Sequence, residues 1–326
     1  MELLTDEIQA PNRAFYYICL VLISVPIRNL KRMHMRFYLC LIALIVFASA
    51  CESRKQENEE TASSGNANTP VTLQLKWETD TLLTTCESVI YDEDQQVLYV
   101  ANINGQPNQK DGNGFISKVS LEGEITEAHW VQGMDAPKGM GLHDGKLYVA
   151  DIDRVHEVDI ESGRISNTIP VEGAQFLNDI TVDNGKIYIS DSDGGTIYLL
   201  EDGQLTAWME NLDGPNGLFS ENGELLVALW NGKSLNTVDA SSKEISLRSE
   251  GIENPDGIEA IGNNEFLVSS WNGMVHHIDS DWKKTLVLDT RQDSLNAADI
   301  EYISSMNLLL VPTFFKNKVM AYEVVD

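Results

Sequence analysis

The stretch GPNGLFSENGELLVALW, residues 214–230, decides the fold of this chain. It contains two short apolar strands joined by Glu-Asn-Gly, a turn sequence typical of β-hairpins. The same arrangement returns about forty residues later, a period typical of repeat folds, as NPDGIEAIGNNEFLVSSW, residues 254–271. Asp256 there takes the place of Asn216. A polar residue repeated just ahead of a buried strand indicates a position with a shared purpose.

Four further segments follow the same plan, and the body shows no helical period. They are CESVIYDEDQQVLYVAN (86–102), APKGMGLHDGKLYVADI (136–152), FLNDITVDNGKIYISDS (176–192) and NAADIEYISSMNLLLVPT (296–313). With the strands that follow, most repeats hold four strands in about forty residues. Six repeats predict an all-β fold, a six-bladed β-propeller over residues 71–326. The last repeat is one strand short, and VTLQLKWE, residues 71–78, is expected to complete it and close the ring.

The residue that opens each repeat is expected to start the innermost strand of its blade and to face the central channel. These positions are Glu87, Lys138, Asn178, Asn216, Asp256 and Ala298. Carboxylate and amide oxygens without sulfur or imidazole suit a hard cation such as Ca²⁺ or Mg²⁺. A cation would also relieve the repulsion between Glu87 and Asp256. The alternative is that Asn and Asp before Gly are ordinary turn residues around a water-filled channel. The glycine that follows is expected to let the backbone turn tightly.

In these motifs the chain resembles the SMP-30 family, which includes regucalcin, gluconolactonase and luciferin-regenerating enzyme. The resemblance lies in CESVIYD, FLNDITVD, GPNGLF and NPDGIEA, in order and in register. It implies a six-bladed propeller with one divalent cation, Ca²⁺ first and Mg²⁺, Zn²⁺ or Mn²⁺ as alternatives, and lactone hydrolase activity. It also implies that Glu87, Asn216 and Asp256 bind the metal, and that Asn178 contacts the substrate or metal-bound water.

One position departs from the gluconolactonase branch. The Arg two residues before the Asn of the Asn-Asp motif is here Phe176, so a hydroxyl-rich sugar lactone loses its expected partner. Lys138 is expected either to bind a substrate carboxylate or ring oxygen, or only to balance the two acids. Trp230 and Trp271 occupy equivalent places in adjacent repeats and are predicted to flank the pocket. The alternative for both tryptophans is packing between blades.

Together these features predict a divalent-metal-dependent hydrolase of a lactone or related cyclic ester. The cation would polarise the carbonyl, and Asp256, or an acid beside the ring such as Asp179 or Asp299, would accept a proton from water. Asn178 is the other residue assigned to catalysis. A serine or cysteine nucleophile is not favoured, because no Gly-x-Ser-x-Gly motif occurs and no histidine is expected beside Cys86. The alternative is a non-catalytic ligand- or protein-binding propeller with a structural metal.

The charge of the chain limits its partners. Asp and Glu number 50 against 23 Lys and Arg, a net charge of −27. An acidic body repels phosphate backbones, so nucleic-acid binding is not expected. The four cysteines form no Cys-x-x-Cys pair, which gives no support for a zinc ribbon or a thiol redox centre. The expected partner is a small-molecule lactone, bound by a monomer.

Residues 1–50 are predicted to be a signal-peptide region, with translation starting at Met33 or Met35. The segment MHMRFYLCLIALIVFASAC (33–51) has a positive start, an apolar run and small residues before its final cysteine. The earlier apolar run AFYYICLVLISVPI fits this reading poorly, and the alternative for it is a short membrane segment.

The end of that signal resembles a bacterial lipobox, with Ala48 in place of the usual leucine. It implies cleavage before Cys51, lipid on the sulfur of Cys51 and a lipid-anchored protein of the bacterial cell envelope, periplasmic or surface-facing. The alternative is an ordinary signal peptide with an incidental cysteine. Residues 51–70 are polar and lack apolar periodicity, as expected of a flexible tether.

Overall fold

The computed structural model describes residues 70–325. The predicted signal peptide, the lipidation site Cys51 and the predicted tether up to residue 69 lie outside the described residues. Within residues 70–325, no helix is long and apolar enough to cross a membrane.

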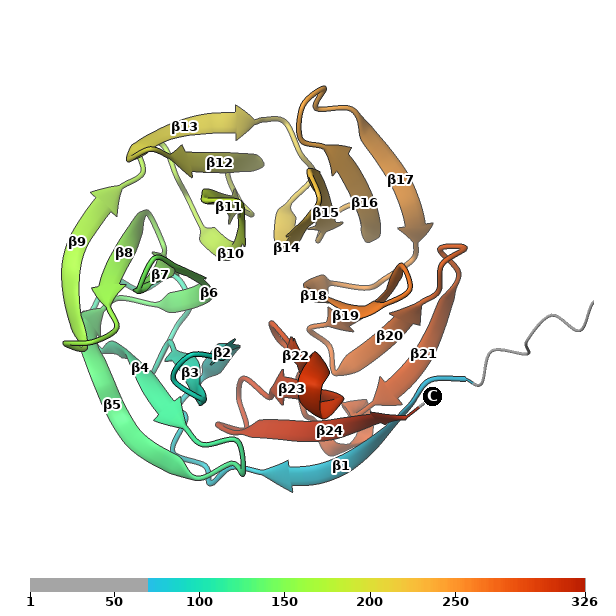
Figure 1. Ribbon diagram of the computed structural model, residues 1–326, viewed down its shortest axis with the longest axis horizontal. Coiled ribbons are helices and arrows are strands. Elements are labelled where there is room, and N and C mark those ends of the chain that lie inside the picture. The colour runs from blue at the N-terminus through green and yellow to red at the C-terminus, as the bar shows by residue number, and fades with distance from the viewer. Residues whose placement is uncertain (1–69, 326) are drawn as a thin grey trace, which may run out of the picture. The chain divides into compact units, whose positions relative to one another are not determined.

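Six four-stranded antiparallel sheets stand around a central axis, each with its first strand innermost (Figure 1). The inner strands are β2 (Cys86–Asp92), β6 (Pro137–His143), β10 (Leu177–Asp183), β14 (Pro215–Glu221), β18 (Pro255–Gly262) and β22 (Glu301–Ile303). The second strands are β3 (Val97–Asn102), β7 (Lys146–Asp151), β11 (Lys186–Asp191), β15 (Glu224–Leu229), β19 (Glu265–Ser270) and β23 (Leu308–Pro312). This arrangement confirms the predicted six-bladed β-propeller.

The third and fourth strands form the outer half of each blade. The third strands are β4 (Gly114–Val119), β8 (Arg154–Asp159), β12 (Thr196–Glu201), β16 (Ser234–Asp239), β20 (Met274–Ile278) and β24 (Val319–Val325). The outer strands are β5 (Ile125–Met134), β9 (Arg164–Pro170), β13 (Gln204–Met209), β17 (Ile245–Glu250), β21 (Lys284–Asp289) and β1 (Thr72–Glu78). Two single-turn 3₁₀ segments, η2 (Arg291–Asp293) and η3 (Ser304–Met306), flank the start and the hairpin of the sixth blade.

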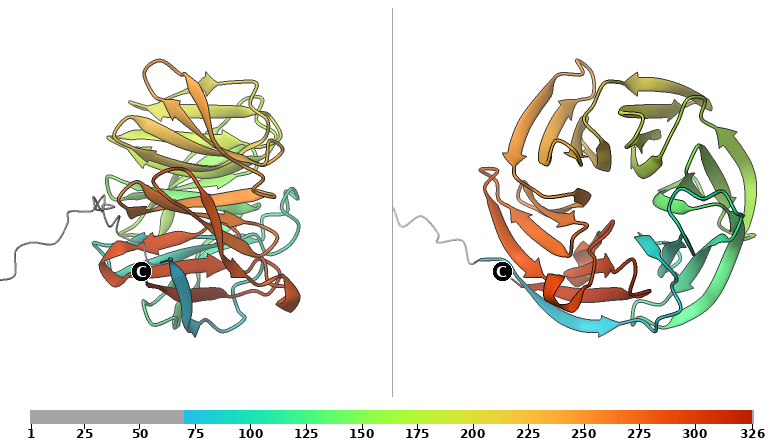
Figure 2. Two further views of the ribbon diagram at one scale, coloured as in Figure 1. Left: turned by 90° about the vertical axis from the view of Figure 1, so that its right-hand side faces the viewer. Right: turned by 180° about the vertical axis from the view of Figure 1, so that it is seen from behind.

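The ring is closed by the strand predicted to close it. β1 pairs antiparallel with β24, from Thr72 opposite Val325 to Glu78 opposite Met320. The first strand of the chain therefore forms the outer edge of the blade that the last three strands begin, and both views along the axis show the two side by side (Figures 1 and 2). Closure pairs the two ends of the domain through backbone hydrogen bonds and leaves no gap in the ring.

The turns predicted from sequence join the inner and second strands. Asn222 and Gly223 have φ angles of 55° and 82°, and Asn184 and Gly185 have φ angles of 50° and 81°. Two consecutive positive φ values are the requirement of a two-residue hairpin turn whose twist matches the strands. Asn and Gly tolerate this conformation, which explains why the repeats carry them there.

The core lies between neighbouring blades rather than inside one sheet. One cluster joins Leu98 and Val100 of β3 to Leu310 of β23, and another joins Ile189 of β11 to Ala150 of β7. The middle strands of each blade are buried on both faces by such contacts, which accounts for runs such as LYVA and LLLVP. This packing places the starts of all inner strands around one end of the central channel.

Candidate active site

A β-bulge positions the polar residue at the start of five inner strands. In β14, Pro215 pairs with Leu229 and Leu218 pairs with Val227, so Asn216 and Gly217 together face a single residue of β15. The register shifts at the same place in β2, β6, β10 and β18. Bulges of this kind re-aim a side chain and are common beside active sites. The sequence pattern gave the ring of anchors, but the bulge that directs it was not predicted.

The glycine after the anchor has a different purpose from the one expected. A Cβ on Gly217 would lie 1.7 Å from the carbonyl oxygen of Asp256, and one on Gly257 would lie 2.5 Å from the nitrogen of Ile300. Neither glycine has a positive φ angle. The expectation of a tight turn is therefore wrong at these positions. Glycine is required because neighbouring inner strands approach too closely to admit a side chain.

The anchors line a cavity of about 430 Å³ at this end of the channel. Five of the six predicted positions contribute to its lining: Glu87, Lys138, Asn178, Asn216 and Asp256. The sixth, Ala298, is fully buried in an apolar cluster with Phe314. The cavity is large enough to hold a small-molecule ligand. The structure thus brings the proposed metal ligands and the proposed substrate contacts into one space.

Two polar atoms in this cavity have no hydrogen-bond partner. They are Oε2 of Glu87 and Oδ1 of Asn216, and both side chains are almost fully buried. The amide of Asn216 hydrogen-bonds the carboxylate of Asp256, which occupies its nitrogen and leaves its oxygen unpaired. Buried polar atoms without a partner are uncommon in native proteins. Two such oxygens beside the carboxylate of Asp256 fit a hard cation, which takes carboxylate and amide oxygens.

Asn178 is held with its oxygen available. Its Nδ2 donates to the hydroxyl of Ser192 at 3.1 Å, and that hydroxyl donates to the carbonyl of Pro215 at 2.9 Å. Because the Ser192 proton is used, its oxygen can only accept, which fixes the orientation of the Asn178 amide. Sequence reasoning missed Ser192, and the only signal was its place directly after the second strand of its repeat.

The carboxylates alone do not make a conventional metal cluster. Among residues 70–325, no three His, Cys, Asp or Glu side chains are grouped so that they could hold a metal ion. The predicted ligand set has only two carboxylates, Glu87 and Asp256, and amide oxygens must supply the rest. The donor set therefore consists of carboxylate and amide oxygens, which suit a hard cation.

Lys138 is the buried cation of the cavity. Its ammonium donates to the carbonyl of Ala136 at 3.1 Å and lies 4.3 Å from the ring centroid of Phe176. Burial lowers its pKa to about 8, against the opposing charges of Glu87, Asp151 and Asp193. One backbone hydrogen bond leaves donor capacity for an oxygen acceptor, so both predicted roles, charge balance and ligand binding, remain open to it.

The pKa values of the two anchor acids, Glu87 and Asp256, are raised. Burial raises the pKa of Asp256 to about 8, with the charge of Asp179 adding to the effect and the hydrogen bond from Asn216 opposing it. Burial and the charge of Asp256 raise the pKa of Glu87 well above its usual range, while the Lys138 ammonium opposes the rise. A cation between the two carboxylates would lower both pKa values, since it favours their charged forms.

Asp179, predicted to be catalytic, lines a different cavity from the anchors. Its carboxylate accepts the backbone N–H of Leu218 and of Ile180, each at 2.6 Å, and it lines a second cavity further along the channel. Asp299, the other acid considered, lines that second cavity too. The bulge separates Asn178 from Asp179, so that the two adjacent side chains serve different cavities. Asp179 therefore lines a different cavity from Asn178, although its charge still raises the pKa of Asp256 and of Glu87.

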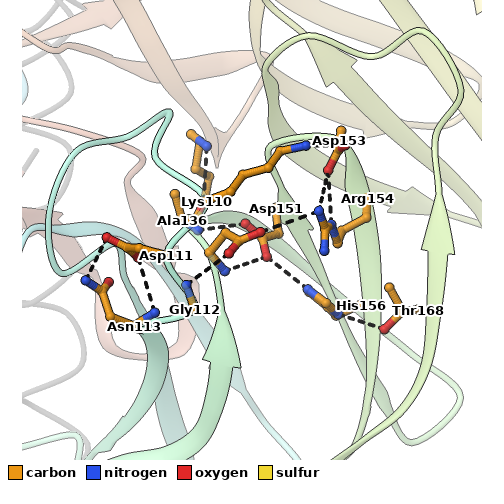
Figure 3. Close-up of polar contacts among 12 residues, drawn as sticks. Lys110, Asp111, Gly112, Asn113, Ala136, Asp151, Asp153, Arg154, His156 and Thr168 are labelled. Atoms are coloured by element: carbon orange, nitrogen blue, oxygen red, sulfur yellow. Dashed lines mark hydrogen bonds and ion pairs between the residues drawn. The ribbon is translucent and has the colours of Figure 1, made fainter.

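A polar network outside the cavity holds the backbone segment to which Lys138 is hydrogen-bonded. Asp151 accepts the backbone N–H of Asp135 and of Ala136 at 2.8 and 2.7 Å, and it contacts Nε2 of His156 at 2.9 Å (Figure 3). Although burial opposes it, the pKa of Asp151 is lowered by the hydrogen bonds from His156 and the two amides. The carbonyl of Ala136 is the acceptor of the Lys138 ammonium. Asp151 thus fixes the loop that holds the lysine, and it does not face the cavity.

Trp230 and Trp271 both line the cavity, as predicted, and Phe176 lies among its lining residues. Sequence reasoning missed Phe314, Phe315 and the loop residues Gln106 and Pro107, which also line it. The phenylalanines follow the second strand of the sixth repeat, as the tryptophans follow theirs. That equivalence was available in the sequence but was obscured by the irregular sixth repeat.

Cys86 is directed away from the cavity. Its side chain is fully buried and its sulfur donates to the carbonyl of Lys318 at 3.2 Å. Burial raises the pKa of the thiol to about 12, despite opposing backbone hydrogen bonds. A thiol held neutral is a poor nucleophile.

No protein family and no curated protein matches this chain. Among solved structures, streptogramin B lyase is similar with a TM-score of 0.59 and 14% identity, over 78% of this chain and 98% of that chain. A chain of a nidogen/laminin complex is similar with a TM-score of 0.53 and 17% identity, over 62% of this chain and 79% of that chain. At these identities the similarity supports the propeller fold and nothing more specific.

Proposed function

We propose that this chain is a divalent-metal-dependent hydrolase of a lactone or related cyclic ester, similar to gluconolactonase, with Ca²⁺ as the preferred cation. The observation that carries the proposal is the pair of unpaired buried oxygens, Glu87 Oε2 and Asn216 Oδ1, in the cavity that also holds Asp256. The resemblance of four ordered motifs to the SMP-30 family supports the same ligands. The proposal also places the protein in the bacterial cell envelope through a lipid on Cys51.

Glu87, Asn216 and Asp256 would hold the cation, and Asn178 would face it with its free amide oxygen. When bound, the cation would polarise the ester carbonyl and lower the pKa of a water molecule. Asp256 would accept a proton from the attacking water at its carboxylate. Asp179 is less suited to that step, since both of its oxygens accept backbone N–H groups.

Lys138 would bind an oxygen of the substrate with the donor capacity that Ala136 leaves unused. Its charge would favour the developing carboxylate of the ring-opened product. Phe176, Trp230 and Trp271 would surround the bound substrate and reduce its contact with water. The residues of this chain can therefore bind the substrate, orient a water molecule and accept a proton within one cavity.

The test is turnover before and after chelation on one sample of purified protein. δ-Valerolactone, δ-decalactone and glucono-δ-lactone share a six-membered ring and form a matched panel, and acid release reports their hydrolysis. We expect chelation to abolish turnover and Ca²⁺, Mg²⁺, Zn²⁺ or Mn²⁺ to restore it, with Ca²⁺ most effective. Bound metal without turnover would instead support a non-catalytic binding propeller, and absence of metal binding would refute the assigned ligands.

A further inference from the structure

The cavity has walls of unlike chemistry. Four aromatic side chains from the fourth, fifth and sixth blades form one side, which we call the aromatic wall: Trp230, Trp271, Phe314 and Phe315. The second and third blades contribute the ammonium of Lys138 and the carboxylate of Asp193, with the ring of Phe176 beside the ammonium. An aromatic wall facing a polar one indicates a ligand with an apolar part and a polar part.

The aromatic wall is continuous. The ring centroids of Trp230 and Trp271 are 6.4 Å apart, and Phe314 and Phe315 lie 5.4 and 5.8 Å from Trp271. Phe314 and Phe315 meet edge to face at 4.8 Å. Rings at these separations form one connected apolar surface.

The wall is also open to the ligand. Phe315 is 58% exposed, so this large apolar side chain is left at the rim of the cavity rather than used in the core. An apolar group lying against it would remove apolar area from water on both partners. The hydroxyls of a sugar lactone placed there would lose hydrogen bonds to water and find aromatic rings instead.

We infer that the substrate is a lactone carrying an apolar substituent, an alkyl chain or an aromatic ring, that lies against the aromatic wall. The lactone carbonyl then faces Lys138 and the anchor residues. This inference rests on the proposed function for the word lactone, whereas the preference for an apolar substituent rests on the wall alone.

The experiment separates binding from turnover by using lactams, which keep the ring and carbonyl but resist hydrolysis. Calorimetry would compare 6-pentylpiperidin-2-one with piperidin-2-one on the purified protein. We expect the pentyl compound to bind about 30-fold more tightly, because several methylene groups leave water at the wall. Equal affinities for the two lactams would overturn the inference.

Variants test whether the wall causes the preference. Phe315→Ala alters a rim residue without opening the core, and we expect it to reduce the pentyl preference about threefold to tenfold. Trp271→Ala should reduce it further. Leu247→Ala is the matched control, since Leu247 is 54% exposed on β17, an outer strand, and should leave the preference unchanged. A preference that persists in both wall variants would overturn the inference.

Lactone turnover distinguishes this inference from the function on which it rests. Higher kcat/KM for δ-decalactone than for δ-valerolactone and glucono-δ-lactone supports both. Turnover of glucono-δ-lactone alone would overturn the apolar substrate and keep the hydrolase. A pentyl preference among lactams without turnover of any lactone would overturn the hydrolase and keep the role of the wall.

Discussion

The two ends of the central channel hold buried acids that differ in their hydrogen-bond partners. At one end, Glu87 and Asp256 share a cavity with an ammonium and with oxygens that have no partner. At the other end, a cavity of about 310 Å³ is lined by four acids and by no lysine or arginine: Asp179, Glu259, Asp299 and Glu301. Three of these acids accept backbone N–H groups: Asp179 from Leu218 and Ile180, Glu259 from Tyr302, and Glu301 from Tyr91.

This difference indicates which buried acids can bind a ligand. Burial raises the pKa of Glu301 to about 8, as it does for Asp256, but the backbone N–H of Tyr91 donates to the Glu301 carboxyl. Glu87 instead keeps an oxygen that nothing in the described chain satisfies. A buried acid supports ligand binding where its oxygens lack donors, and stabilises the fold where the backbone supplies them.

The largest expected effect is on turnover. Asp256→Asn keeps the size of the side chain but removes the proton acceptor, and kcat should fall by about 10²–10⁴-fold. Glu301→Gln is the matched control, because Glu301 lines the second cavity and not the one that holds the anchors; it should change kcat less than twofold. Hydrolysis of δ-decalactone, with circular dichroism to show that both variants fold, checks the pair. Equal loss of turnover in the two variants would contradict the division between the ends.

Calcium should stabilise the protein through one end only. At a concentration about 100 times the dissociation constant, a ligand of the native state adds about 2.7 kcal/mol. For a domain of this size that corresponds to a rise in Tm of roughly 5–10 °C. Thermal denaturation with and without Ca²⁺ measures the shift, which Glu87→Gln should abolish and Glu259→Gln should preserve. A shift that survives Glu87→Gln would move the cation site away from the anchors.

The pH dependence of stability should separate the ends again. Chiefly by burial, the pKa of Asp256 is raised to about 8 from its ordinary value of 3.8, so the native state keeps a proton that the unfolded state releases between these values. The metal-free protein should therefore lose stability as pH rises from about 4 to about 8. Added Ca²⁺ should reduce this loss, because it favours the ionised anchors.

The loss of stability that remains in the presence of Ca²⁺ is expected to come from the acids at the other end of the channel. Glu301, whose pKa is also about 8, contributes a slope of the same sign that Ca²⁺ does not relieve. Glu301→Gln should reduce the slope that remains in the presence of Ca²⁺. Urea denaturation at a series of pH values measures the free energy of unfolding. Stability that stays constant with pH over this window would show that these carboxyls are ionised in the native protein without a cation.

The sequence was sufficient to predict the fold because the hairpin pattern repeats about every forty residues. Six repeated hairpins, three of them with Asn-Gly or Asp-Gly turns, fix strand order, and Thr72–Glu78 had only one unfilled edge to join. The anchors followed from the same repeat, since Asn216 and Asp256 occupy one position in two copies. Local pattern and global arrangement agree throughout the propeller.

The rest of the site depends on atoms that no pattern specifies. Whether Oε2 of Glu87 or Oδ1 of Asn216 is paired depends on neighbouring strands in three dimensions. The bulge that sends Asn178 and Asp179 to different cavities adds one residue without changing the spacing of the repeats. Phe315 was missed because a repeat with a shortened inner strand offers no register by which to count to it.

The smallest expected effect concerns the neighbour of an anchor. Cys86 precedes Glu87 on β2 and is directed away from the cavity, with its sulfur on the carbonyl of Lys318. Cys86→Ala should lower the free energy of unfolding by about 1 kcal/mol, as typical single substitutions do, and change kcat less than twofold. A thiol reagent should react with Cys86 only after unfolding, because burial holds the thiol neutral and inaccessible. Loss of turnover in a folded Cys86→Ala protein would make the cysteine the nucleophile and remove the reason for placing the chemistry on Asp256. Retained turnover would show that the adjacent residues Cys86 and Glu87 of β2 have separate roles. Cys86 then belongs to the core and Glu87 to the cavity.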